Sequence, residues 1–294
     1  MNSSLLLGTH IHPATGDAAR RQVRAMTCLR DLCPTPPVNL QFADRVNLQD
    51  FEGFDTLAVL RHDSNTVTGH HGVRKPVVSE LFTCLAEAAV ERGARYFGFT
   101  NSDILFTPAA IERLQRGDRT AYIFARTDFE TGMERDGHSL IYGTDAFVVE
   151  AAWWLSHRHR FRPYVVGESC WDNVYTAQLL CWAGGLLLNR EPLVRHEGHA
   201  VVWLQSTFAN HNGYLAALDR MYFTRWVIYA ERLAHLRHAA NGLADEESEL
   251  RLQDHVFRDW RPTTADHVLQ ALRVTKLKTR VWLRGHAGGA VGTV

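Results

Sequence analysis

Apolar residues in the first half of the chain fall into two alternating patterns. Short, nearly continuous apolar runs predict strands at 4–11, 38–43, 54–61, 94–107 and 120–129. Between them, apolar residues recur every three or four positions, which predicts helices at 17–33, 75–93 and 108–117. Pro76 in the first turn and Gly93 after the last support the longest of these helices, and 62–74 is predicted to be a polar loop.

Strands that alternate with helices form a mostly parallel sheet that carries helices on both faces. The predicted fold class is therefore α/β. Beyond this region, residues 211–260 have helical patterns, and their apolar stripe predicts core packing rather than a cofactor site. The stripe consists of Trp226, Tyr229, Leu233 and Leu236.

Composition limits the classes of partner. The 294 residues hold 32 Lys+Arg and 32 Asp+Glu, so the zero net charge argues against a general nucleic-acid binder. The number of cysteines, five, is odd, and no two of them have the C-x-x-C spacing of a zinc site. This predicts reduced thiols and a cytoplasmic protein. No run approaches about 20 apolar residues, so we expect at most peripheral membrane contact. The basic stretch 274–294 is one candidate for such contact, but a frayed tail is the stronger expectation for it.

The apolar run 94–107 contains Asn101-Ser102-Asp103 in its middle. A carboxylate at a strand end either satisfies free backbone N–H groups in a turn or binds a metal. Because Ile104, Leu105 and Phe106 continue the apolar pattern, a simple turn fits poorly. Mg²⁺ and Mn²⁺ bind one or two carboxylates together with substrate phosphates, and ligands of parallel sheets bind beyond the carboxyl ends of strands.

The segment YFGFTNSDILF resembles the DxD-type motif of GT-A-fold glycosyltransferases, in an Asn-Ser-Asp variant. The resemblance covers roughly residues 4–205 and implies a Rossmann-like fold that binds a nucleotide sugar through Mn²⁺ or Mg²⁺. Asp103 matches the last acid of the motif and is the expected metal ligand. Asn101 occupies the position of the usual first acid, and Asn101 and Ser102 are expected to contact the donor or acceptor.

Two further segments extend the resemblance. In GVRKPVVSELF (72–82), Arg74 and Lys75 are expected to meet the nucleotide or its phosphates, although basic residues beside a helix start are often only solvated. Downstream, Asp145 follows Gly143-Thr144 and precedes an apolar run. It either accepts hydrogen bonds from sugar hydroxyls or shapes a turn before a strand.

The segment GESCWD (167–172) resembles the one that supplies the catalytic base of inverting GT-A enzymes, between a strand to Gly167 and a helix near Trp171. Asp172 is the preferred base and Glu168 the second candidate, because a carboxylate must remove the proton of the acceptor hydroxyl. An acid near a helix start is also favoured by the helix dipole alone. Trp171 either stacks on a sugar or belongs to the core.

The segment LLLNREPLVRHEGHAVVW (186–203) resembles an H-x-x-H segment of related transferases, in which a histidine completes the metal site or contacts the diphosphate. His196 and His199 are the matching residues here. The segment follows a predicted strand and is expected to form a loop that closes over the site.

The leading hypothesis is a metal-dependent glycosyltransferase, with residues 1–205 as the GT-A-like domain. It would move a sugar from a nucleotide-diphosphate sugar to a hydroxyl of a glycan or glycoconjugate, as in polysaccharide biosynthesis. The alternatives are a nucleotidyltransferase, which would need a more Gly-rich loop after the first strand, and a sugar-binding protein with a degenerate site. Residues 206–294 are expected to form a helical extension packed on this domain, or else an element for homodimerisation or acceptor binding.

Overall fold

The computed structural model describes residues 5–132, 137–199, 208–242 and 244–260, with isolated positions between 263 and 279; for 138–142 it describes the backbone alone. The stretch 274–294 lies almost wholly outside this part. Among the described residues, no helix combines the length and the apolar character needed to cross a membrane.

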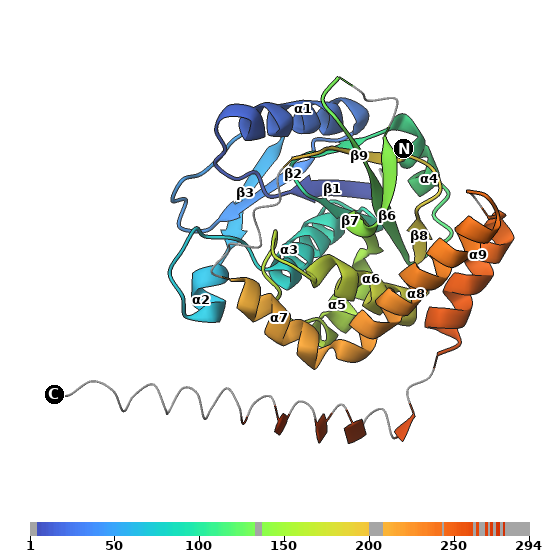
Figure 1. Cartoon of the computed structure of the whole chain (residues 1–294). Coiled ribbons are helices and arrows are strands. Elements are labelled where there is room, and N and C mark those ends of the chain that lie inside the picture. The colour runs from blue at the N-terminus through green and yellow to red at the C-terminus, as the bar shows by residue number, and fades with distance from the viewer. Residues whose placement is uncertain are drawn as a thin grey trace.

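The centre of the protein is one mixed β-sheet, which confirms the predicted α/β class (Figure 1). Its strand order is β3-β2-β1-β4-β7-β6-β9-β5, and β8 also pairs with β6. Strands β3, β2, β1 and β4 are parallel to one another, and β8 and β9 are parallel to β6. Strand β7 is antiparallel to both of its neighbours, β4 and β6. Strand β5 is antiparallel to β9. The strands are β1 Leu5–Thr9, β2 Val38–Phe42, β3 Asp55–Leu60, β4 Tyr96–Thr100, β5 Ile104–Phe106, β6 Ala121–Phe129, β7 His138–Glu150, β8 Leu186–Leu188 and β9 Val194–Glu197.

Helices cover both faces of the sheet (Figure 1). On one face, α1 and α4 pack over apolar residues such as Leu7, Ile104 and Phe124. On the other, α3, α5, α6 and α8 form the larger core, where Phe82 contacts Phe97. The helices are α1 Gly16–Leu32, α2 Ser64–Thr68, α3 Val78–Glu91, α4 Pro108–Gln115, α5 Ala151–His157, α6 Trp171–Trp182, α7 Ala209–Leu218, α8 Arg220–Ala239 and α9 Glu246–Gln253, with a 3₁₀ turn at Arg158–Arg160 and a π-helical turn at Asp254–Arg258.

Strand β4, which leads into the Asn-Ser-Asp motif, is buried along its whole length. Gly98 lies at its centre because a Cβ there would collide with Leu7 of β1 and Val148 of β7. The neighbouring strands therefore pack closely on both sides of β4. This close packing fixes the point at which the chain leaves the strand and enters the motif.

Four details of the predicted elements are wrong. The run 94–107 is two strands, because the chain turns at 101–103 and β5 pairs with β9 instead of extending β4. The loop 62–74 contains α2, which Asp63 caps by accepting from the N–H of Thr66. Pro76 precedes α3, which begins at Val78, rather than lying in its first turn.

The fourth correction concerns the strand expected to run to Gly167. Residues there form only an isolated bridge between Val77 and Val165, followed by turns. Gly167 and Cys170 both have positive φ angles, of 70° and 73°. Two left-handed positions three residues apart are incompatible with a continuing strand and instead redirect the chain into α6.

The helical pattern of 211–260 is confirmed by α7, α8 and α9. Trp226, Tyr229 and Leu233 of the predicted stripe are buried in the same large core as α3 and α6. The described part of the extension therefore packs against the α/β region rather than standing apart from it. The boundary at residue 205 stays a prediction.

Candidate functional site

The Asn-Ser-Asp motif lies where β4 ends and the chain turns into β5. Strand β5 pairs with β9, and Ile104 is directly opposite His196. This pairing brings His196 beside Asp103, although the two residues are far apart in the sequence. The expectation that 186–203 forms a loop is wrong at this point, because β9 places His196 on a strand that also pairs with β6.

Asp103, His196 and His199 converge to form what we call the Asp–His–His cluster. The Nε2 atom of each histidine lies 3.5 Å from Oδ2 of Asp103. This separation is long for a hydrogen bond, but it is close to the roughly 3.0–3.4 Å between two atoms that each ligate one ion at about 2.1 Å. All three ligand atoms lie within 4.8 Å of one another, so the cluster fits a single divalent cation.

The donor set also indicates which cations suit the cluster. Imidazole nitrogens favour transition ions, whereas Mg²⁺ prefers oxygen ligands alone. Of the two ions predicted from the sequence, two histidines and one carboxylate therefore favour Mn²⁺. Asp103 and His199 retain 30% and 32% exposed side-chain surface, which leaves the cluster accessible from solvent.

Asp128 of β6 supports the cluster from behind. Its Oδ1 lies 2.9 Å from Nδ1 of His196, which leaves Nε2 directed at Asp103. Burial lowers the pKa of His196, but its bonds to Asp103 and Asp128 outweigh burial and raise that pKa to about 9. Burial alone would raise the pKa of Asp103, yet its two histidine partners hold it well below the ordinary value. A carboxylate behind a ligating histidine commonly fixes the ring orientation.

A second group of contacts connects the motif with Asp145 of β7. The Asn101 amide donates to Oδ1 of Asp145 at 2.7 Å, and Arg126 donates to Oδ2 at 2.6 Å. Nε of Arg126 also lies 2.9 Å from Asp128. Asp145 is buried, and burial raises its pKa despite the opposing effect of Arg126. Arg126 therefore joins the Asp145 contacts to the Asp–His–His cluster.

Ser102 faces α1 rather than the Asp–His–His cluster. Its hydroxyl accepts from the Gln22 amide at 3.0 Å and lies 3.4 Å from Nδ1 of His12. His12 follows the end of β1, and burial lowers its pKa, while nearby Asp103 acts in the opposite direction. Ser102 thus ties the motif to the β1–α1 connection.

The two basic residues predicted to meet the nucleotide occupy different places. Nζ of Lys75 lies 2.6 Å from Glu168, whose side chain is buried. The charge of Lys75 is close enough to His12 to lower the pKa of that ring, opposing the effect of Asp103. Arg74 instead bridges Asp63 and Asp44 and stacks over the Phe42 ring, at the ends of β2 and β3.

Asp172 lies in the first turn of α6, and this turn packs against the ends of β4 and β7. The hydroxyls of Thr144 and Thr176 are 2.9 Å apart, which joins β7 to α6 one residue before Asp145. Burial, reinforced by the charge of Asp145, raises the pKa of Asp172 to about 7. Asp172 as a whole residue is half-buried.

The neighbours of Asp172 have structural roles. Trp171 is 3% exposed and packs against Phe99 and Phe147, so core packing accounts for it without a bound sugar. Asn212 of α7 is fully buried and fixes the segment before α6. Its side chain bonds to both the N–H and the C=O of Val165, at 2.9 and 3.0 Å, and to the C=O of Ser169 at 3.2 Å.

Sequence reasoning missed several of these residues. Arg126 and Asp128 end the otherwise apolar strand β6, which is the same signal that marked residues 101–103. His12 likewise follows an apolar strand. Glu197 lies between the two histidines in the sequence. Its side chain is buried and its carboxylate accepts a hydrogen bond from Arg20 of α1, but nothing in the sequence distinguishes it from an exposed acid.

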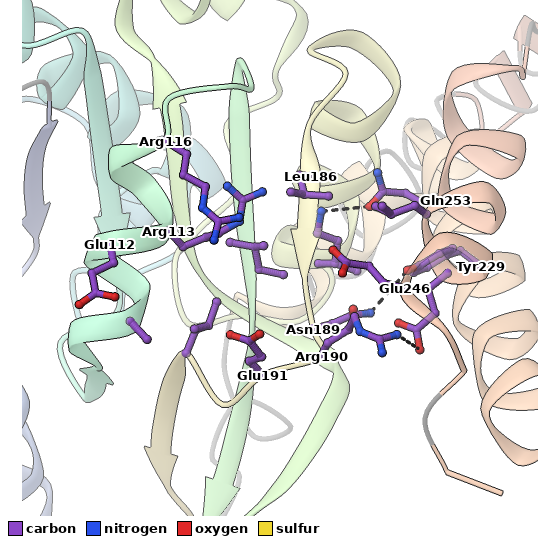
Figure 2. Close-up of a pocket in the computed structure, with 16 residues that line it drawn as sticks. Glu112, Arg113, Arg116, Leu186, Asn189, Arg190, Glu191, Tyr229, Glu246 and Gln253 are labelled. Carbon is purple, nitrogen blue, oxygen red and sulfur yellow. Dashed lines mark hydrogen bonds and ion pairs between the residues drawn. The ribbon is translucent and has the colours of Figure 1, made fainter. Parts of the chain in front are cut away.

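Two cavities in the described part of the chain are not lined by the predicted site residues. One, of about 400 Å³, lies between α4, the end of β8 and the helices α8 and α9. Figure 2 shows Arg113 and Arg116 on one side of it and Tyr229 and Gln253 on the other. The second, of about 530 Å³, is lined by residues that include His62, Glu80 and Phe161. Neither cavity contains a group resembling the Asp–His–His cluster.

No protein-family model and no curated protein sequence matches the chain. Among solved structures, the chain is similar to TarS residues 1–349 from S. aureus, a crystal structure in complex with UDP-GlcNAc. The two chains share 9% sequence identity with a TM-score of 0.46, over 87% of this chain and 71% of the other. At this level of similarity, the chemistry of the site has to be inferred from its own geometry.

Proposed function

We propose that the protein is a metal-dependent glycosyltransferase that uses a nucleotide-diphosphate sugar. The single observation that carries this proposal is the convergence of Asp103, His196 and His199 on one point. Asp145 connects this cluster electrostatically with Asp172, because the charge of Asp103 acts on the pKa of Asp145 and the charge of Asp145 helps to raise the pKa of Asp172 to about 7. Transfer to a hydroxyl requires a group that neutralises the departing diphosphate and a base that takes the hydroxyl proton. The Asp–His–His cluster would meet the first requirement and Asp172 the second.

The donor diphosphate would bind at the Asp–His–His cluster, with Lys75 as a nearby cation. A bound Mn²⁺ ion would supply Lewis-acid stabilisation of the charge on the leaving diphosphate. Asp103, His196 and His199 would hold this ion, while Asp128 keeps the His196 ring in place. His12, which lies near Ser102 and whose pKa responds to Asp103, would contact a phosphate oxygen.

Asp172 would act on the acceptor in an inverting transfer, whereas a retaining enzyme would use this acid differently. Its carboxylate removes the proton of the acceptor hydroxyl as that oxygen bonds to the anomeric carbon and the bond from this carbon to the diphosphate oxygen breaks. The products are the glycosylated acceptor, the nucleoside diphosphate and a proton on Asp172. Glu168 is buried and paired with Lys75, so it would act by holding Lys75 near the donor, and the acceptor would be a glycan or glycoconjugate.

The proposal is tested with a panel of nucleotide sugars and Mn²⁺, following release of the nucleoside diphosphate. We expect saturable release from one donor, and Asp103→Ala should reduce it at least 100-fold because the diphosphate loses its counter-charge. Asp31→Ala is a matched control, since this acid is exposed on α1. Pyrophosphate release from a nucleoside triphosphate and a sugar phosphate would instead identify a nucleotidyltransferase. Absence of nucleotide binding with metal present would exclude both activities.

A further inference from the structure

Asn101 occupies the first position of the acidic motif, yet its amide points to another carboxylate. It donates to Oδ1 of Asp145 at 2.7 Å, and its backbone N–H donates to the C=O of the same residue at 3.1 Å. Asp145 is 6% exposed and receives its other side-chain bond from Arg126. The side chains of Asn101 and Arg126 thus hold the two carboxylate oxygens of Asp145 from opposite sides.

A second negative charge beside Asp145 would be strongly unfavourable. An aspartate at 101 would place two carboxylate oxygens about 2.7 Å apart in a buried setting, where like charges repel strongly. The nearby cation, Arg126, already faces both Asp145 and Asp128. An additional acid would therefore be neither hydrogen-bonded nor neutralised by these partners.

We propose that Asn101 is a positioning residue, and that positions 101 and 145 together accept one carboxylate and one amide, but not two carboxylates. By holding Asp145, the Asn101 side chain fixes the turn that presents Asp103 to His196 and His199. The requirement for one acid at this pair follows from hydrogen bonding and charge alone. Only its effect on metal binding rests on the proposed function.

The test is an exchange of the two side chains. Asn101→Asp should lower the Tm by roughly 5 °C or more and leave Mn²⁺ binding unchanged or weaker. Asp145→Asn should also lower the Tm, because a neutral amide at 145 leaves Asp128 as the one carboxylate that pairs with the Arg126 charge in the described part of the chain. The double variant Asn101→Asp/Asp145→Asn reverses the direction of the hydrogen bond, and it should recover at least half of the Tm lost by Asn101→Asp. Differential scanning calorimetry and titration with Mn²⁺ alone measure both effects.

The competing possibility is that Asn101 ligates the metal directly. Asn101→Asp would then bind Mn²⁺ more tightly with an unchanged Tm, and this result would overturn the proposal. Losses in the double variant equal to the sum of the single losses would also overturn it. Gln115→Glu controls for the added charge, since it introduces a carboxylate at an exposed position of α4. The Tm comparison needs no activity, so failure of the glycosyltransferase proposal would leave it interpretable.

Discussion

The pKa of Asp172 is subject to two opposing effects. The first turn of a helix favours an ionised carboxylate, because free backbone N–H groups point toward it. Burial and the charge of Asp145 favour the neutral form and dominate, so the pKa rises to about 7. A base of this strength can both accept a proton near neutral pH and release it again.

The pH dependence follows from the sign of this shift. A base must be deprotonated to act, and Asp172 is mostly protonated below its raised pKa. We therefore expect kcat/KM to rise with pH through about 7 and to fall roughly tenfold per pH unit well below it. Asp172→Asn should lower kcat at least 100-fold with little change in the KM for the donor. A kcat/KM value that stays level from about pH 5.5 to 8 would contradict the assignment.

At the residue scale, the sequence predicted part of the site. Asp103, His196 and His199 were named as metal ligands, and the structure brings their ligand atoms together. Arg126 and Asp128 were missed because their roles depend on the strands beside them. Strand order is set by long-range packing, which a local pattern does not contain.

At the scale of elements, the hydrogen bonds between α7 and the segment 165–169 determine where α6 begins. Asn212 bonds to both backbone groups of Val165, as a neighbouring strand would, and also holds Ser169. This segment leads through Gly167 and Cys170 into the first turn of α6. A helix outside the α/β region therefore fixes the position of Asp172.

Replacing Asn212 should affect stability and turnover together. Asn212→Leu leaves the N–H and C=O of Val165 buried without these partners, at a cost of about 2–4 kcal/mol in the free energy of unfolding. We also expect a lower kcat with a nearly unchanged KM for the donor, because Asp172 shifts while the diphosphate site is retained. Urea unfolding and steady-state kinetics measure the two effects. Asn210→Ala, at an exposed position of the same helix, should change neither.

Element types were predicted better than element ends. The helices over 17–33, 75–93 and 108–117 and the strands before them are present, because their apolar periodicity is strong. The break at 101–103 and the strand β9 were not predicted. Both depend on the pairing of β5 with β9, whose partners are distant in the sequence.

At the scale of the whole molecule, the described extension and the α/β region share one core. Trp226, Tyr229 and Leu233 of α8 lie in the same cluster as Phe82 and Phe97. Periodicity alone indicated that the stripe of α8 is buried, but not which surface covers it. The covering surface is supplied by α6, which packs directly against α8.

A chain ending at residue 205 should therefore not fold stably. Removal of α8 would expose the apolar surface of α6 to water, at a cost of roughly 25 cal/mol per Å². We expect the truncated chain to be aggregated or to lack a cooperative thermal transition, measured by circular dichroism. A monomeric 1–205 fragment with a sharp transition would show that the α/β region is an independent domain.

The Asp–His–His cluster has a consequence for the unfolded chain as well. Asp103 and His196 lie roughly ninety residues apart, so an ion held between them acts as a removable cross-link that closes a long loop. Binding to the folded form alone stabilises it by RT ln(1 + [L]/Kd), which is about 2.7 kcal/mol when the free ion exceeds its Kd a hundredfold. The melting temperature should then rise with added Mn²⁺ and fall again with a chelator, and Asp103→Ala should abolish this response. Under the proposed function, the ion that prepares the site for a donor would also help to keep β5 and β9 together, and the stability of the protein would then depend on the supply of that ion.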